Sequence, residues 1–119
     1  MDEKEYAYRG LQAQAMDIQQ QLQSLQALMA ECSAAGKALE NLKSDAIFPI
    51  GSGVLVPATT RGGKVLVEIG AGLVAEKTRE EARAILKAKA EKLEYAFGRA
   101  EAALKEAARR MAELESSMK

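Results

Sequence analysis

The amino-acid sequence predicts a mainly α-helical chain with a small β segment: a long antiparallel coiled-coil helical hairpin whose arms are joined by two β-hairpins. Apolar residues recur at alternating spacings of three and four along residues 3–44 and again from residue 78 onward, which is the heptad pattern of coiled-coil helices. Between these segments the pattern becomes alternating, and the phrase Ile-Gly-x-Gly occurs twice, from Ile50 and from Ile69. We therefore expect one domain, 1–119, made of a helix (1–45), a β segment (46–77) and a second helix (78–119).

The composition narrows the possible functions. Aromatic residues make up 4% of the chain and Trp is absent, while Ala, Leu, Val and Ile supply most of the apolar content, as in long helices. The 17 basic and 17 acidic residues cancel, so no overall field attracts nucleic acid or an anionic membrane. There is no His, one Cys and no cluster of acids at ligand spacing, which argues against zinc sites, catalytic triads and His-based catalysis. We expect neither an enzyme nor a cofactor or metal site.

Two further features bear on location and on nucleotide binding. The sequence contains no recognisable signal peptide and no apolar run approaching the ~18 residues of a membrane span, so the expected compartment is the cytoplasm. The glycines around Ser52 are not followed by the Gly-Lys-Ser/Thr of a phosphate-binding loop, and they lie between two strand patterns. Nucleotide binding is therefore not expected.

The first helix is expected to be continuous because residues 3–44 contain no Pro, and Gly occurs only at positions 10 and 36. Its outer positions are rich in Gln, which hydrates a surface without adding charge. The lone cysteine, Cys32, lies in the heptad stripe, where a small buried hydrophobe is the expected role. The stripe consists of Tyr8, Leu11, Ala15, Ile18, Leu22, Leu25, Met29, Cys32, Gly36 and Leu39.

The middle segment predicts four short strands. Alternating β-branched residues favour strands, and the Ser52 and Ala71 regions, each flanked by glycines, are expected to turn two hairpins. Apolar residues also occupy the opposite face of the small sheet, at Leu55, Leu66 and Val74. Four strands cannot close a barrel of about eight strands, so open edges remain for pairing with other chains. The sequence therefore predicts association through this sheet.

The second helix begins with a capping box. Thr78 and Glu81 have the spacing at which a Thr side chain caps the first turn and a Glu three residues later bonds back to the cap. Charged residues fill the outer positions of this helix. Its stripe consists of Leu86, Ala90, Leu93, Phe97, Ala100, Leu104, Ala107, Met111, Leu114 and Met118.

The two stripes fit an antiparallel pairing. If paired residue numbers add up to 122, as Ala15 and Ala107 do, every layer joins two stripe residues, and large side chains often meet small ones, as interdigitation requires. The layer of Leu25 and Phe97 should anchor the hairpin, whereas Ala15 with Ala107 should add little. The hairpin should therefore be weakest at its free end, built from residues 1–16 and 107–119, where apolar side chains form a soft tip.

Taken together, the segments around Phe48-Pro49-Ile50-Gly51-Ser52-Gly53-Val54, Lys64-Val65-Leu66-Val67, Ile69-Gly70-Ala71-Gly72 and Glu76-Lys77-Thr78, flanked by long helices, resemble the α-type subunit of archaeal prefoldin. Two hairpins instead of one distinguish the α type from the β type. The resemblance implies a hexamer of two α and four β subunits whose strands form a double β-barrel. It also implies an ATP-independent chaperone that holds unfolded proteins between coiled-coil tips and delivers them to a group II chaperonin.

The resemblance and the apolar tip together suggest two sets of site residues. Client contact is predicted at the tip, although three of its members, Leu11, Met111 and Leu114, can equally be the last core layers. The client-binding set is Tyr6, Tyr8, Leu11, Met16, Met111, Leu114 and Met118. Assembly is predicted to depend on strand residues that form the barrel interface: Val54, Val56, Val65, Val67, Ile69, Leu73 and Val74.

Two other functions fit the same sequence. Open sheet edges would also allow a self-assembling prefoldin-like protein that forms filaments or homo-oligomers without a β-type partner. A coiled-coil adaptor that dimerises through its stripe and binds one defined partner is the second alternative.

Overall fold

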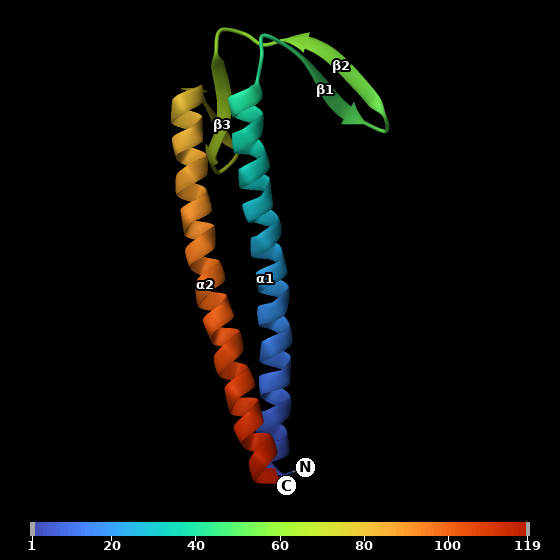
Figure 1. The fold of residues 1–119 in the computed structure, drawn as a ribbon, viewed down its shortest axis with the longest axis vertical. Helices are drawn as coiled ribbons and strands as arrows, with labels where there is room; N and C mark the ends of the chain where they lie inside the picture. The colour runs from blue at the N-terminus through green and yellow to red at the C-terminus, as the bar shows by residue number, and fades with distance from the viewer. Residues whose placement is uncertain (1, 119) are drawn as a thin grey trace. The chain divides into compact units, whose positions relative to one another are not determined.

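The computed structural model describes residues 2–118 (Figure 1). Helix α1 spans Glu3–Asn41 and helix α2 spans Arg79–Met118. Between them lie strands β1 (Asp45–Gly51), β2 (Val54–Thr59), β3 (Lys64–Gly70) and β4 (Leu73–Thr78). The fold class predicted from the sequence, two long helices joined by two antiparallel β-hairpins, is confirmed.

The chain divides into two compact units, one formed by Cys32–Lys89 and the other by Met1–Glu31 with Ala90–Lys119. In the second of these units the buried apolar residues are Leu11, Ile18 and Ala107. In the unit that carries the hairpins they are Cys32 and Ala82. Every predicted stripe residue of both helices is buried or half-buried except Met118, so the heptad pattern identified the packed face of each helix.

Contacts between the helices agree with the predicted antiparallel register. That register places Lys4 opposite Met118 and Glu40 opposite Ala82. The observed partners are one residue away: the Lys4 ammonium bonds to the Ser117 carbonyl at 3.4 Å, and Arg83 pairs with Glu40 at 3.0 Å. Both contacts lie within single units of the chain, and both long side chains can reach a neighbouring position on the facing helix.

The strands form two separate two-stranded sheets, β1–β2 and β3–β4. This corrects the expectation of one small four-stranded sheet. Each hairpin closes through a two-residue turn in which both residues have positive φ: Ser52 and Gly53 at 50° and 80°, and Ala71 and Gly72 at 52° and 76°. Such type I′ turns match the twist of the paired strands. The hairpins are therefore complete locally and leave both outer edges of each sheet unpaired within the described chain.

Candidate functional site

The free ends of the two helices lie together in the unit formed by Met1–Glu31 and Ala90–Lys119. Asp2 caps the start of α1, because its carboxylate accepts a hydrogen bond of 2.8 Å from the Glu5 amide. At the other terminus the Ser117 hydroxyl donates to the Leu114 carbonyl at 2.9 Å. These bonds lie in the first turn of α1 and the last turn of α2, near which the predicted tip residues are displayed.

The predicted tip residues fall into two groups. Tyr6 is 75% exposed and Met16 is 63% exposed, and Met118 is also on the exposed surface. Leu11 is buried, while Tyr8, Met111 and Leu114 are half-buried. The first group offers apolar surface to a partner in this conformation, whereas the second group forms the last core layers between the helix ends.

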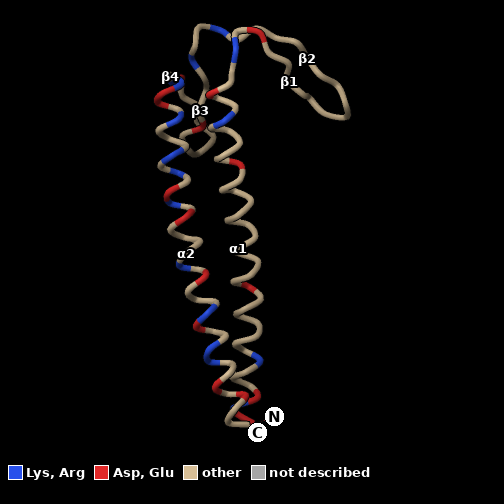
Figure 2. Tube along the Cα trace, in the orientation of Figure 1, with Lys and Arg blue, Asp and Glu red and all other residues tan. Residues whose placement is uncertain are grey.

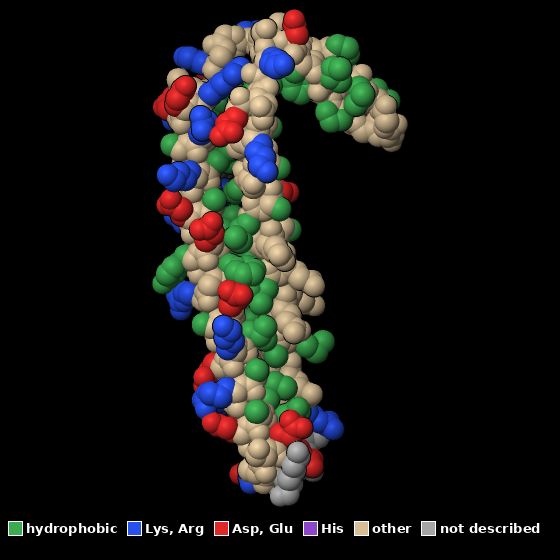
Figure 3. Space-filling model, viewed as in Figure 1, with side chains coloured by type: hydrophobic (Ala, Val, Ile, Leu, Met, Phe, Trp, Pro, Cys, Tyr) green, Lys and Arg blue, Asp and Glu red, His purple; other side chains and the backbone are tan. Residues whose placement is uncertain are grey.

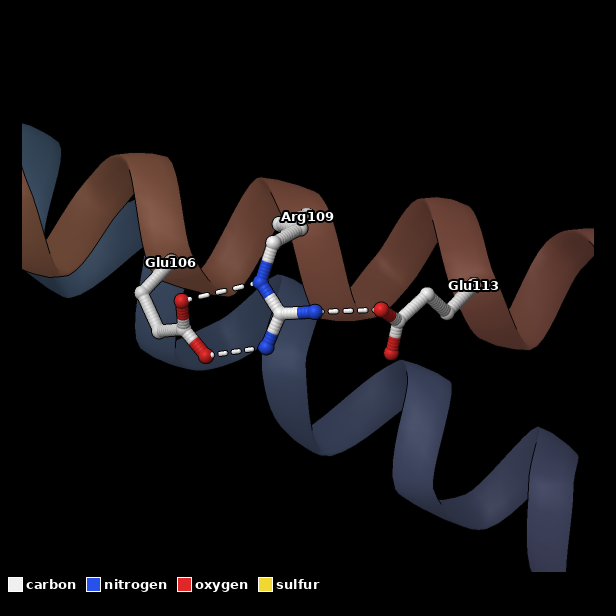
Figure 4. Close-up of polar contacts among 3 residues, drawn as sticks. All are labelled: Glu106, Arg109 and Glu113. Carbon is white, nitrogen blue, oxygen red and sulfur yellow. Dashed lines mark hydrogen bonds and ion pairs between the residues drawn. The ribbon is translucent and has the colours of Figure 1, made fainter.

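Charged groups border this apolar surface. A recess at the helix ends is lined by Asp2, Glu3, Lys4, Glu5, Ser117 and Met118. Farther along α2, the Arg109 guanidinium donates to both oxygens of Glu106, at 3.0 Å and 2.6 Å, and also pairs with Glu113 (Figure 4). The hydrogen bond from Arg109 lowers the pKa of Glu106, and the two carboxylates raise that of Arg109. These exposed pairs keep their face of α2 charged and solvated.

The first hairpin, β1–β2, presents an almost uncharged surface. Figure 2 shows that Lys, Arg, Asp and Glu are spread along α2, whereas this hairpin carries only Asp45. Large apolar side chains are exposed along it, and Figure 3 shows hydrophobic side chains crowded on the hairpin. These residues are Ile47, Phe48, Ile50, Val54, Leu55 and Val56.

The second hairpin, β3–β4, is more amphipathic. Lys64 and Glu76 approach to 4.0 Å, and Glu68 lies on the same strand face by alternation along β3. Val65 and Val67 are half-buried, whereas Leu66, Ile69, Leu73 and Val74 are exposed. Of the seven residues predicted to carry assembly, the two half-buried ones are Val65 and Val67; the other five offer open apolar surface.

The junction of the hairpins with the helices is held by three carbonyl groups just beyond the end of α1. The Arg79 guanidinium donates to the Leu42 carbonyl at 2.8 Å. The Thr60 amide donates to the Ser44 carbonyl at 2.7 Å, and its hydroxyl donates to the Lys43 carbonyl at 3.2 Å. These bonds give partners to three carbonyls in the link between α1 and β1, and they hold the start of β1 against Thr60 and Arg79.

The capping box at the start of α2 is present as predicted. The Glu81 amide donates to the Thr78 hydroxyl at 3.1 Å, and the Thr78 amide donates to the Glu81 carboxylate at 3.0 Å. The backbone hydrogen bond from Thr78, aided by its hydroxyl, lowers the pKa of Glu81. The second helix is thereby anchored directly to the last strand.

Comparisons with known proteins decide the family. The family model for prefoldin subunits matches residues 11–119. The chain belongs to the prefoldin family. Prefoldin subunit alpha of Methanococcoides burtonii is 33% identical over 117 residues, covering 93% of this chain and 85% of that protein. Prefoldin subunit alpha of Thermofilum pendens is 33% identical over 118 residues, covering 94% of this chain and 92% of that protein.

A solved structure shows the same fold. The cryo-EM structure of filamentous PFD from Methanocaldococcus jannaschii superposes with a TM-score of 0.78, at 24% identity, and covers 95% of this chain and 98% of that chain. The resemblance to α-type archaeal prefoldin is thus confirmed, and the two hairpins that carried it are present. The protein is a prefoldin-type chaperone subunit, from a family whose members associate with other prefoldin subunits.

Within residues 2–118 no group of three or more His, Cys, Asp or Glu side chains is placed to hold a metal ion. Among the same residues no helix is long and apolar enough to cross a membrane. Cys32 is buried in the stripe, in agreement with its predicted packing role.

The sequence-based site sets missed part of the prefoldin hairpin surface. Ile47, Phe48, Ile50 and Leu55 are exposed on β1–β2 but were not among the predicted interface residues. The signal was available in the sequence, because residues 46–58 contain no charge and are apolar at both odd and even positions. The sequence pattern places Leu55, Leu66 and Val74 on the opposite face of the strands, yet of these three only Val74 is in the predicted set.

Proposed function

We propose that this chain is a subunit of an ATP-independent holdase, which captures unfolded proteins at the free ends of its helices and delivers them to a group II chaperonin. The proposed assembly is a cytoplasmic hexamer in which two copies of this α-type chain join four β-type subunits. Holding a client requires contact surface and no bond-making chemistry, so the proposal assigns no catalytic residue and no cofactor.

One observation carries the client-binding part of this proposal. Tyr6 and Met16 expose most of their surface near the start of α1, and Met118 lies at the end of α2. Met is flexible and polarizable, and such side chains can pack against many different partners. Tyr combines an apolar ring with a polar hydroxyl that tolerates water. This chemistry suits transient contact with unrelated unfolded chains.

The remaining predicted tip residues take part only if the helix ends separate. Tyr8, Leu11, Met111 and Leu114 pack toward the core of their unit, and the outermost layers are those with the fewest neighbours along the helices. Fraying of terminal turns costs little free energy in proteins generally. In the proposed mechanism, an arriving client replaces the contacts that these side chains make with each other.

The hairpins support the assembly part. Each two-stranded sheet leaves both edges open, and an isolated two-stranded hairpin is marginally stable at best in water. Five of the seven predicted interface residues are exposed, and burial of a large apolar side chain contributes about 1.5–3 kcal/mol. Strand pairing with neighbouring subunits would cover the exposed side chains and satisfy the edges together.

The proposal is tested by diluting chemically unfolded citrate synthase into nucleotide-free buffer and following light scattering. The chain is added alone or with a β-type archaeal prefoldin subunit. Suppression that requires the β-type subunit supports the heteromeric holdase, and absence of suppression in both mixtures contradicts it. Deleting residues 1–10 and 112–119 should abolish suppression while assembly persists; a truncated assembly with full activity would refute the tip as the client site.

Self-assembly is the second candidate function. It is favoured by the open edges of both hairpins and by the similarity in fold to a prefoldin described as filamentous. In this case the purified chain should form homo-oligomers or filaments and suppress aggregation by itself. Sedimentation velocity of the chain without a β-type subunit separates the two candidates, because the hexamer proposal expects only small species.

A further inference from the structure

The sulfur-containing side chains of this chain lie outside the β segment. The sequence has five Met and one Cys, and none of them falls within residues 45–78, which contain the four strands. Met1 lies outside the described residues, and the others belong to the two helices: Met16, Met29, Cys32, Met111 and Met118. Oxidation of sulfur therefore alters side chains of the helices and none of the hairpins.

The sulfur-containing side chains of the helices differ in their access to solvent. Met16 is 63% exposed and Met118 is 39% exposed, whereas Cys32 is buried. Met29 and Met111 are half-buried in the heptad stripe. An oxidant reaches sulfur from the surrounding water, so susceptibility to oxidation follows exposure. Met16 and Met118 should therefore react before Met29 and Met111, and Cys32 should be protected.

Both exposed methionines belong to the free ends of the helices, where client contact is proposed. Met16 lies outside the heptad stripe, so the packing of the two helices does not require an apolar residue there. Its neighbours three and four residues away on the helix surface are uncharged: Gln12, Ala13, Gln19 and Gln20. Met118 lines the recess at the helix ends together with Asp2 and Ser117. A small oxidant dissolved in water can reach both side chains.

We propose that Met16 and Met118 form a reversible oxidation site that controls client capture, with hydrogen peroxide as the oxidant. The peroxide O–O bond breaks, one oxygen atom forms an S=O bond with the methionine sulfur, sulfur gives up two electrons, and the other oxygen leaves as water. Methionine sulfoxide reductases reverse this step: a dithiol supplies two electrons and becomes a disulfide, and the sulfoxide oxygen leaves as water. This inference rests on the proposed client site and adds its regulation.

Oxidation changes the polarity of the tip and spares the rest of the subunit. The sulfoxide is polar, so its burial against an apolar client segment is no longer favourable. Met16 contributes little to the core, and Met118 lies in the last turn of α2, where fraying costs little free energy. The hairpins contain no sulfur, so assembly should persist. A leucine at either position would offer a similar apolar surface without this sensitivity.

The inference is tested by treating the chain alone with hydrogen peroxide, removing the excess with catalase, and then adding an untreated β-type archaeal prefoldin subunit. Peptide mapping by mass spectrometry follows the oxidation of each methionine, sedimentation follows assembly, and light scattering of unfolded citrate synthase follows client capture. Oxidation of Met16 and Met118 should lower client affinity at least roughly fivefold, while assembly is unchanged. Methionine sulfoxide reductases for both sulfoxide epimers, with dithiothreitol, should restore the affinity.

The helices supply a matched pair of variants. Met16→Leu with Met118→Leu keeps apolar side chains of similar volume at the tip but removes their oxidation. Met29→Leu with Met111→Leu makes the same change in the stripe. Each variant is compared with its own untreated sample. The first should lose less than about twofold in client affinity after peroxide, whereas the second should lose as much as the unaltered chain.

The outcomes separate this inference from the holdase proposal. Full client affinity after confirmed oxidation of Met16 and Met118, or an equal loss in their leucine variant, would overturn the inference. Oxidation of Met29 and Met111 as fast as that of Met16, or failure of the oxidised chain to assemble, would also contradict it. Absence of suppression before any peroxide is added refutes the holdase proposal and this inference with it, so the two failures appear in different samples.

Discussion

Replacing Tyr6 and Met16 together by serine should remove client binding while leaving the fold intact. Tyr6 is 75% exposed and Met16 is 63% exposed, so the native chain has buried little of either side chain. Substitutions at such surface positions usually change the free energy of unfolding by less than about 0.5 kcal/mol. The thermal transition of the helices and the assembly state should therefore match those of the unaltered chain.

The expected loss of affinity follows from the same exposure. A large apolar side chain contributes about 1.5–3 kcal/mol when it passes fully from water into an apolar contact. A client can cover only the exposed part, which scales this to about 1–2 kcal/mol for each residue. If the two contributions add, the affinity for an unfolded client should fall roughly 30- to 1000-fold.

The assay is suppression of light scattering by chemically unfolded citrate synthase, titrated with assembled chaperone. Tyr95→Ser is the matched control, because Tyr95 is comparably exposed but lies in the middle of α2, away from the free end of that helix. The guanidinium carbon of Arg99 lies 6.0 Å from the centre of the Tyr95 ring. The control should suppress scattering as well as the unaltered protein does. If the Tyr6 and Met16 variant retains full activity, or if Tyr95→Ser loses as much, the helix ends are not the client site.

Four further changes test the fold and the assembly. Val67→Asp should leave free subunits in sedimentation with the β-type subunit, because a buried charge without a partner is costly; normal assembly would count against the predicted interface. Thr78→Ala removes the cap of α2 and should lower its free energy of unfolding, measured by circular dichroism, by about 1 kcal/mol, whereas an unchanged value would mean that the capping bonds contribute nothing. Ala107→Leu overfills a buried position and should cost about 1–3 kcal/mol, while Ala108→Leu on the exposed side serves as control and should cost far less; equal stabilities would show that this layer is loosely packed. The pKa of Glu81 is lowered from 4.5, so its capping contribution is complete above that pH and is lost as the pH falls through the lowered pKa. An acid titration of Glu81→Gln should therefore lack that loss, and identical titrations would refute the link.

Much of this architecture could be predicted because it depends on local patterns. The heptad stripes marked the packed faces of both helices, since a residue every three or four positions stays on one side of a helix. The Thr78–Glu81 spacing predicted a capping box that both hydrogen bonds confirm. The glycines around Ser52 and Ala71 predicted the turns, because these positions require positive φ.

The features that could not be predicted depend on distant contacts. The first helix was expected to continue to about residue 44, yet it ends at Asn41. The carbonyls beyond that point bond to Thr60 and Arg79, which no local pattern reveals. The local strand pattern likewise does not show whether the two hairpins share one sheet, and in the structure they form two. Tyr6 and Leu11 were both predicted client contacts, but only Leu11 belongs to the heptad stripe, in agreement with the burial of Leu11 and the exposure of Tyr6. The stripe does not show whether the packed face stays closed at the tip.

The junction beyond α1 has a consequence for how the chain is made on the ribosome. The carbonyl of Leu42 is bonded by a residue that is synthesised 37 positions later. At about 5–20 residues per second, that donor emerges roughly 2–7 seconds after its acceptor. During this interval the first helix has neither its partner helix nor its C-terminal anchor, and its apolar stripe faces water. A nascent subunit thus passes through a state in which its first apolar stripe is exposed before the second helix exists to cover it.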